Sequence, residues 1–172
     1  MKNFYKKNKL KPIINVSGFM TKIGASITNK KSIEAANNIF PYFVNIDELQ
    51  AIASKRISKL IKSEAALITA SAAGALTESI AAMMTGNDLD KIYQLPKTNK
   101  IKNKVLIQKG HLTNYGAEVG QGISLSGAKI ISCGSKNICT EEMFKKTLKK
   151  NKSTICCAMY VVSHHCSDYN SI

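Results

Sequence analysis

The sequence predicts an α/β fold in which helices cover both faces of a mostly parallel β-sheet. Three observations support this prediction. Apolar runs of strand length alternate with longer segments whose apolar residues recur every three to four positions, as in amphipathic helices. The strand-length runs are apolar throughout, which is typical of strands that are buried on both faces. The chain of 172 residues is also long enough to bury one hydrophobic core.

The amino-terminal part of the chain predicts an arm and one short helix. The first dozen residues are rich in lysine and asparagine and predict an extended arm, followed by a short extended segment at residues 12–18. A helical pattern covers residues 31–40 and is followed by a proline, which cannot continue a helix. We therefore expect residues 1–45 to form an arm with a short helix and residues 46–172 to form the larger domain.

The larger domain opens with the clearest helix, which is expected at residues 45–62. Asn45 can cap this helix, and its apolar residues fall on one face. Residues 65–69 predict a buried strand, and residues 72–84 predict a helix of small residues that ends at Gly86. The rest of the chain predicts strands at 92–95, 105–107, 128–132 and 154–162, with helices at 114–124 and 140–149.

The formal net charge of +14 suggests a polyanionic partner. The composition of that charge weakens the suggestion, because Arg56 is the only arginine and the lysines are scattered among asparagine and isoleucine. Sequence-specific nucleic-acid sites favour arginine, whose guanidinium group pairs with a base through two hydrogen bonds. We therefore favour solvated lysine-rich faces over a dedicated nucleic-acid surface.

Cysteine and hydropathy patterns argue against several other protein classes. The five cysteines are an odd number and include no CxxC pair. Cys156 and Cys157 lie in an apolar run and are expected to be reduced thiols of a cytoplasmic protein. His164 and His165 lack further ligands at zinc spacing, so no metal site is expected. No apolar stretch is long enough to predict a signal peptide or a membrane span.

Two strand ends carry residues that suggest a ligand site. The strand at 65–69 leads into a helix start whose free N–H groups suit a phosphate. That helix start carries only small or hydroxyl side chains, namely Ser71, Ala72, Ala73 and Gly74. The strand at 105–107 leads into His111, whose imidazole can stack on a planar ring or transfer a proton. Since parallel strands end at one edge of a sheet, these features predict a flat, phosphorylated ligand.

Each of these features has a plainer interpretation when it is taken alone. Ser71 is equally suited to an ordinary helix cap, and His111 to a loop histidine that bonds a backbone carbonyl. The strand at 154–162 ends in Ser163 and His164, which are better explained as part of a ligand crevice than as a hydrolase site. No GxSxG motif is present to support a serine nucleophile.

Five segments in order carry a family resemblance. Their sequences are INVSGFMTKIGAS at 14–26, FVNIDELQ at 43–50, SEAALITASAAGAL at 63–76, LIQKGHLTNYGAEV at 106–119 and YVVSHHC at 160–166. Together they resemble the selenocysteine synthase-like family of pyridoxal-phosphate enzymes, which includes L-seryl-tRNA selenium transferases and D-glucosaminate-6-phosphate ammonia lyases. The most specific parts are LIQKGHxxNYGA and SHHC.

The resemblance implies the aminotransferase-like fold (fold type I), pyridoxal 5′-phosphate as cofactor and active sites at a homodimer interface. It implies that residues 71–74 cradle the cofactor phosphate and that His111 acts as the catalytic histidine against the pyridine ring. Ser163 is expected near the cofactor. Residues expected near the substrate or at the entrance are Ser17, Gly18, Thr21 and His164.

The resemblance also indicates what the chain lacks. Family members are longer, and the additional part carries the lysine that binds the cofactor covalently and an aspartate that pairs with its ring nitrogen. The chain is therefore expected to be a truncated, amino-terminal portion of a lyase that eliminates from an amino-sugar acid such as D-glucosaminate 6-phosphate. Two alternatives remain open. One is selenium transfer onto seryl-tRNA, disfavoured because residues 14–26 leave no room for a preceding tRNA-binding region, and the other is an inactive fragment.

Overall fold

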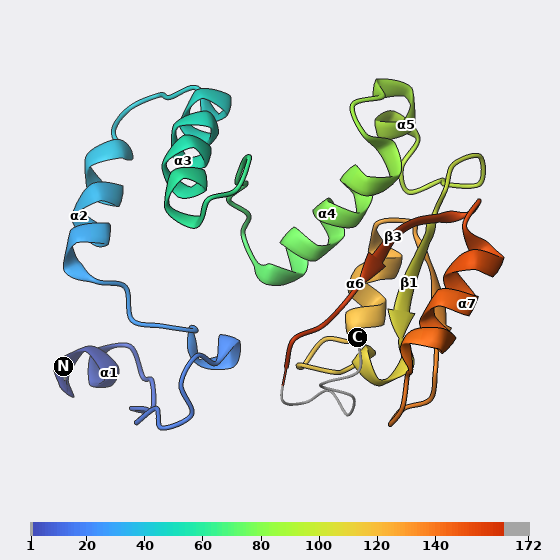
Figure 1. Cartoon of the computed structure of the whole chain (residues 1–172). Helices are drawn as coiled ribbons and strands as arrows, with labels where there is room; N and C mark the ends of the chain where they lie inside the picture. Colours follow the sequence, from blue (N-terminus) through green and yellow to red (C-terminus); the bar gives the residue numbers. More distant parts are fainter. Residues whose placement is uncertain (1, 164–172) are drawn as a thin grey trace. The chain divides into compact units, whose positions relative to one another are not determined.

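A computed structural model describes residues 2–163, and the chain divides into two units, Met1–Ile52 and Ala53–Ile172 (Figure 1). The boundary falls inside helix α3 (Ile46–Ile61). The division into an arm of residues 1–45 and a cofactor domain of residues 46–172 stays a prediction. No helix among the described residues is long and apolar enough to cross a membrane.

The first unit contains short helices joined by irregular segments. Helix α1 (Lys2–Lys7) replaces the expected extended arm, because the chain closes locally: the N–H and the side-chain amide of Asn8 both donate to the Phe4 carbonyl, at 3.1 and 2.9 Å. A 3₁₀ turn, η1 (Thr21–Ile23), follows along the chain. Helix α2 (Lys30–Ile39) then confirms the helix that the sequence predicts at residues 31–40. Asn29 caps α2 by accepting the Ser32 N–H at 2.9 Å.

None of the described residues of the first unit is fully buried. Several of its large apolar side chains are almost completely exposed within the chain, including Ile14 at 90%, Phe19 at 87% and Val16 at 90%. The hydrophobic effect normally removes such side chains from water. The first unit therefore has no hydrophobic core of its own.

Helix α3 begins where the sequence predicts. The Asn45 side chain accepts the N–H groups of Asp47 and Glu48 at 2.9 and 3.2 Å, which confirms the predicted amino-terminal cap. The acidic residues Asp47 and Glu48 lie in the first turn, where the positive end of the helix dipole favours negative charge.

The second unit is built on a three-stranded parallel sheet in the order β2-β1-β3. Its strands are β1 (Lys104–Gln108), β2 (Lys129–Cys133) and β3 (Ile155–Met159). The central strand is the most buried, and Val105, Leu106 and Ile107 have no exposed surface. Leu106 is in register with Ile131 of β2 and Ala158 of β3.

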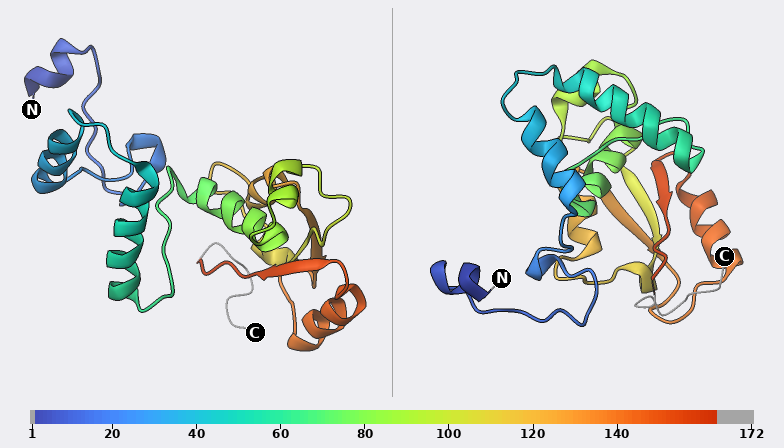
Figure 2. Two further views of the ribbon diagram at one scale, coloured as in Figure 1. Left: turned by 90° about the horizontal axis from the view of Figure 1, so that it is seen from above. Right: turned by 90° about the vertical axis from the view of Figure 1, so that its left-hand side faces the viewer.

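Successive side chains of β1 point to opposite faces of the sheet, and each face is covered by helices (Figures 1 and 2). Val105 and Ile107 pack with residues of helices α4 (Ala72–Thr85) and α6 (Val119–Leu125). Leu106 packs on the other face, against residues of helix α7 (Glu141–Asn151). The expected α/β architecture, with a parallel sheet and helices on both faces, is confirmed.

The prediction of a strand at residues 65–69 is wrong. This segment has no regular structure, and Leu67 and Ile68 are 64% and 54% exposed. A strand is stabilised by hydrogen bonds to a neighbouring strand. The three strands of the described residues pair only with one another, so this apolar segment has no strand beside it.

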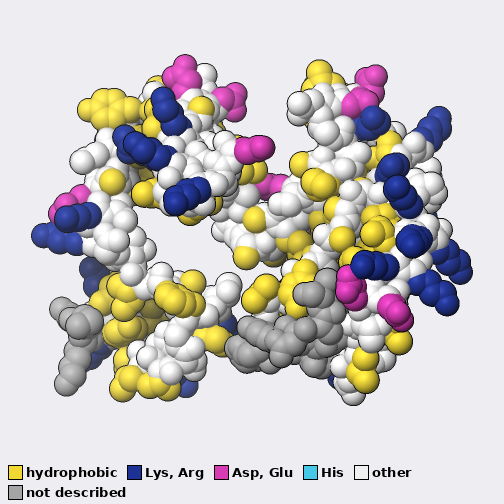
Figure 3. Space-filling model, viewed as in Figure 1, with side chains coloured by type: hydrophobic (Ala, Val, Ile, Leu, Met, Phe, Trp, Pro, Cys, Tyr) yellow, Lys and Arg dark blue, Asp and Glu magenta, His cyan; other side chains and the backbone are white. Residues whose placement is uncertain are grey.

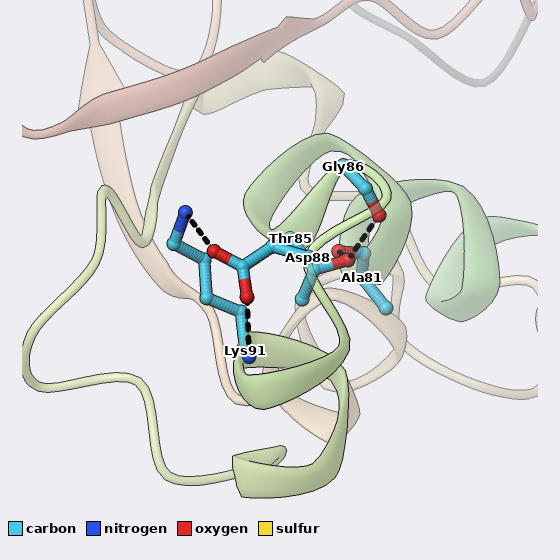
Figure 4. Close-up of polar contacts among 5 residues, drawn as sticks. All are labelled: Ala81, Thr85, Gly86, Asp88 and Lys91. Carbon is cyan, nitrogen blue, oxygen red and sulfur yellow. Dashed lines mark hydrogen bonds and ion pairs between the residues drawn. The ribbon is translucent and has the colours of Figure 1, made fainter.

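The strand expected at 92–95 is also wrong, because most of it lies in helix α5 (Leu89–Gln94). Figure 4 shows the cause at the α4–α5 junction. Asp88 caps α5 by accepting the Lys91 N–H at 3.2 Å, and its carboxylate lies 2.7 Å from the Lys91 ammonium. The hydrogen bond from the Lys91 side chain lowers the pKa of Asp88. The preceding helix ends at Thr85, whose hydroxyl donates to the Ala81 carbonyl at 3.1 Å.

Two further elements differ from their predicted bounds. Helix α6 begins at Val119, not at residue 114, because the Asn114 side chain accepts the Gly116 N–H at 2.8 Å and holds a turn there. Strand β3 ends at Met159 and is only partly buried, whereas the sequence predicts a fully apolar strand through residue 162. It lies at one edge of the described sheet, which leaves one side uncovered.

Lysine side chains gather over α7 (Figure 3). The sequence predicts this helix at residues 140–149, and the structure confirms it with Thr140 as the cap, which accepts the Met143 N–H at 3.3 Å. Lys145, Lys146, Lys149 and Lys150 lie along it, as expected for a solvated charged face. Lys145 forms an ion pair with Glu141, which lowers the pKa of that carboxyl.

Candidate functional site

The start of α4 presents a polar surface that suits a phosphate. The Ser71 hydroxyl accepts the Gly74 N–H at 3.0 Å, and the Ser71 carbonyl accepts the Thr69 hydroxyl at 2.9 Å. Ala72 and Ala73 are exposed, and their N–H groups have no acceptor among the described residues. Two free donors at the positive end of a 14-residue helix therefore fit an anionic oxygen group.

The Ser71 cap leads to a stability prediction. Replacing Ser71 with alanine is expected to lower the free energy of unfolding by about 1 kcal/mol, because the Gly74 N–H loses its acceptor. Urea denaturation followed by circular dichroism measures the change. Ser79→Ala is the matched control, since Ser79 is an exposed interior residue of the same helix. Equal effects of the two substitutions would show that the cap contributes nothing.

The end of β1 places His111 in the interior of the second unit. The strand leads into a 3₁₀ turn, η2 (Lys109–His111), and His111 has no exposed surface. Its Nδ1 accepts the Val161 N–H at 3.2 Å, so the neutral imidazole carries its proton on Nε2. The Tyr160 ring contacts the imidazole edge to face, with ring centres 4.5 Å apart and an interplanar angle of 85°.

A hydrogen bond connects helix α4 to the part of the chain that follows His111. The Thr77 hydroxyl, in the second turn of α4, donates to the Gly122 carbonyl of α6 at 3.0 Å. This bond therefore ties α4 to α6, which begins eight residues after His111. In Figure 1, α4 starts toward the end of the sheet at which β1 finishes.

The remaining predicted site residues are placed less completely. Ser163 follows Val161 by two residues, so the bond from Val161 to His111 brings Ser163 into the neighbourhood of the imidazole. His164 lies outside the described residues. Ser17, Gly18 and Thr21 are exposed residues of the first unit. The roles assigned to all of these residues stay predictions.

Two of the residues predicted at the entrance, Ser17 and Gly18, lie in one polar turn. Asn15 organises it: its side-chain oxygen accepts the Ser17 N–H at 2.9 Å, and its amide donates to the Gly18 carbonyl at 2.6 Å. Gly18 has a φ of +79°, which side chains other than glycine rarely adopt. The turn therefore depends on both Asn15 and Gly18. Of these two residues, only Gly18 was predicted from the sequence.

Sequence reasoning missed Gln108, the last residue of β1. Its side chain has no exposed surface, and neither Nε2 nor Oε1 has a hydrogen-bond partner among the described residues. A buried amide without partners is destabilising, so such groups commonly mark a place where a further polar group binds. One signal was available: a polar residue directly follows the apolar run of residues 105–107, three positions before His111.

A surface hollow of about 710 Å³ adjoins this region, because Leu112, the residue after His111, lines it together with residues of α6 and β2. The hollow includes none of the predicted site residues. Among residues 2–163, no cluster of three or more histidine, cysteine or acidic side chains could hold a metal ion. The start of α4 and the segment after β1 therefore define the candidate site.

No known protein-family profile matches the chain. The chain is 30% identical over 164 residues to D-glucosaminate-6-phosphate ammonia lyase of Salmonella typhimurium, a match that covers 95% of this chain and 44% of the relative. It is 26% identical over 127 residues to a Streptomyces 5′-C-glycyluridine monooxygenase-decarboxylase, with 73% of this chain and 32% of the relative covered. The chain thus spans less than half the length of these curated relatives.

A solved structure of D-glucosaminate-6-phosphate ammonia-lyase matches with a TM-score of 0.92 and 29% identity, covering 99% of this chain and 45% of that one. The fold and the site at the carboxyl end of its sheet define an α/β domain of the aminotransferase-like class. More particularly, the chain belongs to the selenocysteine synthase-like family that includes D-glucosaminate-6-phosphate ammonia lyase, as its ordered motifs imply.

Proposed function

We propose that this chain provides the phosphate-binding part of a pyridoxal-phosphate lyase that deaminates an amino-sugar acid of the D-glucosaminate 6-phosphate type. The observation that carries the proposal is the start of α4, where the Ser71 hydroxyl and two free N–H groups are suited to an anionic oxygen group. The name of a relative that matches 95% of this chain supports the lyase reaction and its small-molecule substrate.

The residues of this chain have separable tasks in that reaction. The N–H groups of Ala72 and Ala73 and the Ser71 hydroxyl would hold the phosphate of the cofactor. His111, fixed by Val161, would position the cofactor ring and hold a proton at Nε2. Bound pyridoxal phosphate supplies an electron sink for the electrons left at the α-carbon of the substrate. We expect the lysine that holds the cofactor covalently to come from a segment outside this chain.

The same proposal includes a homo-oligomer in the cytoplasm. The exposed apolar side chains of the first unit support an oligomer, because they have no covering layer within that unit. The four described cysteines are all outside disulfide bonds, which supports a reducing compartment.

Binding of pyridoxine 5′-phosphate to the full chain tests the phosphate site. This probe has no aldehyde, so it cannot react with the many lysines of the chain. Calorimetric titration is expected to show binding of pyridoxine 5′-phosphate and much weaker binding of pyridoxine, which lacks the phosphate. Ser71→Asp is expected to weaken binding on the order of tenfold or more, because it sets a negative charge against the phosphate. Ser79→Asp, in the same helix, is the charge-matched control.

Two outcomes would contradict the phosphate site. One is equal affinity for pyridoxine 5′-phosphate and pyridoxine, and the other is equal weakening by the Ser71 and Ser79 substitutions. Absence of any binding would favour the alternative that the chain is an inactive fragment. Circular dichroism of each variant checks that the fold is intact.

The ring-positioning role of His111 is tested with the same probe. His111→Phe keeps a flat ring, whereas His111→Asn keeps an acceptor for the Val161 N–H but loses the ring. We expect the phenylalanine variant to retain more affinity for pyridoxine 5′-phosphate than the asparagine variant. The reverse order would show that His111 only holds the segment after β3.

Selenium transfer onto seryl-tRNA is a second candidate, and the lysines gathered over α7 are the observation that favours it (Figure 3). Binding of tRNA that persists at moderate salt would support it, because a few loose lysine contacts are lost as counterions compete. Lys149→Gln and Lys150→Gln together should then weaken tRNA binding. Binding that disappears at physiological salt in the unmodified chain would exclude this candidate.

A further inference from the structure

Two cysteines face each other where the chain leaves β2. Cys133 is the last residue of β2, and Cys139 lies six positions later, just before the Thr140 cap of α7. Their sulfur atoms are 3.5 Å apart, and the residues are 4% and 0% exposed. Neither cysteine is in a disulfide bond in this structure.

The backbone between the two cysteines holds them in this position. The Ser135 N–H donates to the Ile138 carbonyl at 2.8 Å, and the Ser135 hydroxyl accepts the Ile138 N–H at 3.0 Å, so the segment closes on itself. Gly134 has a φ of +71°, and a Cβ atom there would lie 2.6 Å from the Cys139 Cβ. Only glycine at this position lets Cys139 approach Cys133 so closely.

We propose that Cys133 and Cys139 form a reversible disulfide bond that locks the loop of residues 133–139. Closing the sulfur–sulfur distance from 3.5 Å to a covalent bond of about 2 Å needs a movement smaller than one bond length. The oxidant is a low-molecular-weight disulfide. Two S–H bonds break and one S–S bond forms; two protons and two electrons reduce the added disulfide to two thiols.

Other cysteines of the described chain are poorly placed for the same reaction. The sulfur atoms of Cys156 and Cys157 are 3.8 Å apart, but these residues are neighbours in strand β3. The Cα atoms of adjacent residues are about 3.8 Å apart, which is shorter than the roughly 4.4–6.8 Å that an unstrained disulfide spans, so a bond between them would be strained. Cys133 and Cys139, in contrast, lie at the two ends of a loop that is closed by hydrogen bonds between Ser135 and Ile138.

Burial determines how fast the proposed bond forms. It raises the pKa of the Cys133 thiol to about 12, so this thiol stays protonated at neutral pH. The thiolate is the attacking species in disulfide exchange, so oxidation is expected to be slow and to accelerate when the loop opens. Cys133 is also in register with Gln108, the last residue of β1. The bond would therefore stiffen the carboxyl ends of β1 and β2, next to the candidate site.

Peptide mapping of the full chain tests the proposal. The chain is incubated with oxidised glutathione, its remaining thiols are alkylated, and trypsin then cleaves after Lys136, between the two cysteines. We expect two peptides joined through Cys133 and Cys139, and dithiothreitol should separate them. The oxidised chain should also resist urea better, by on the order of fifty-fold in its folding equilibrium for a loop of this length.

Matched variants make the outcome decisive. Cys139→Ser should abolish the joined peptides, whereas Cys156→Ser combined with Cys157→Ser should leave them. Gly134→Ala keeps both thiols but crowds Cys139, and it should reduce the yield of joined peptides. A glutathione adduct that persists on Cys139 without joining Cys133, or a bond from Cys139 to a different cysteine, would overturn the proposal.

Discussion

Replacing Gly127 with alanine is expected to lower the free energy of unfolding by about 3 kcal/mol, through backbone strain and a steric clash together. Gly127 has a φ of +88°, and a Cβ atom there would approach the Pro96 carbonyl oxygen far more closely than van der Waals contact allows. A carbonyl of the backbone cannot rotate away as a flexible side chain could. The connection before β2 would have to move away from Pro96.

Buried hydrogen bonds make that movement unfavourable. The Gly127 carbonyl accepts the hydroxyl of Thr98 at 2.6 Å, and Thr98 is only 3% exposed. The Asn103 amide donates to the same hydroxyl at 2.9 Å. Displacing Gly127 would leave the buried Thr98 hydroxyl without its acceptor, which is itself destabilising. Thr98, Asn103 and Gly127 thus join the segments that lead into β1 and β2 through hydrogen bonds.

Gly116→Ala is the matched control for Gly127→Ala. Gly116 has a similar φ of +97°, but a Cβ atom added there would have no neighbouring atom within 4 Å. Its substitution should therefore lower the free energy of unfolding by only about 1 kcal/mol, the strain of a left-handed backbone. Urea denaturation of both variants measures the difference. Equal losses would show that the contact with Pro96 relaxes at no cost.

Replacing Leu106 with alanine is expected to have a larger effect, a loss of about 4 kcal/mol in the free energy of unfolding. Leu106 is fully buried in the central strand, and it packs with Cys133 and Cys139 in the cluster beneath α7. Partly buried side chains complete this cluster, including Phe144 and Leu148 of α7. Removing the leucine side chain would leave a cavity that the sheet, paired on both sides of β1, cannot collapse to fill.

Leu125→Ala provides the comparison for Leu106→Ala. Leu125 is the last residue of α6 and is 67% exposed, so its truncation should change the free energy of unfolding by no more than about 0.5 kcal/mol. Chemical denaturation of the full chain measures both variants. A small effect of Leu106→Ala would indicate that the cluster beneath α7 is loosely packed. It would also argue against a rigid carboxyl end of β1 at Gln108.

Local signals in the sequence predicted helices α2, α3, α4 and α7, whereas α1 and α5 were not predicted. Asn45, Ser71 and Thr140 each accept an N–H group within three residues, and a bond over so short a distance does not depend on the rest of the fold. The apolar runs at 105–107 and 128–132 likewise predicted strands, since the β-branched and apolar residues in them suit a buried sheet. These local patterns were sufficient for the α/β class.

The errors arose where a segment depends on a distant partner or on a competing local bond. Residues 65–69 have the composition of a strand, but no strand lies beside them in the described chain. Residues 92–95 have apolar side chains that suit either a strand or a helix, and the Asp88 cap decides for the helix. Periodicity over four or five residues cannot distinguish these cases.

The candidate site shows the same division between local and tertiary information. The chemical groups, a capped helix start at Ser71 and an imidazole after a strand, could be read from neighbouring residues alone. Three other features become visible only in the folded chain: the bond from Val161 that sets the His111 tautomer, the bond from Thr77 that ties α4 to α6, and the Gln108 amide buried without a hydrogen-bond partner among the described residues. Such contacts join residues far apart in the chain, and their geometry depends on how the sheet and helices pack.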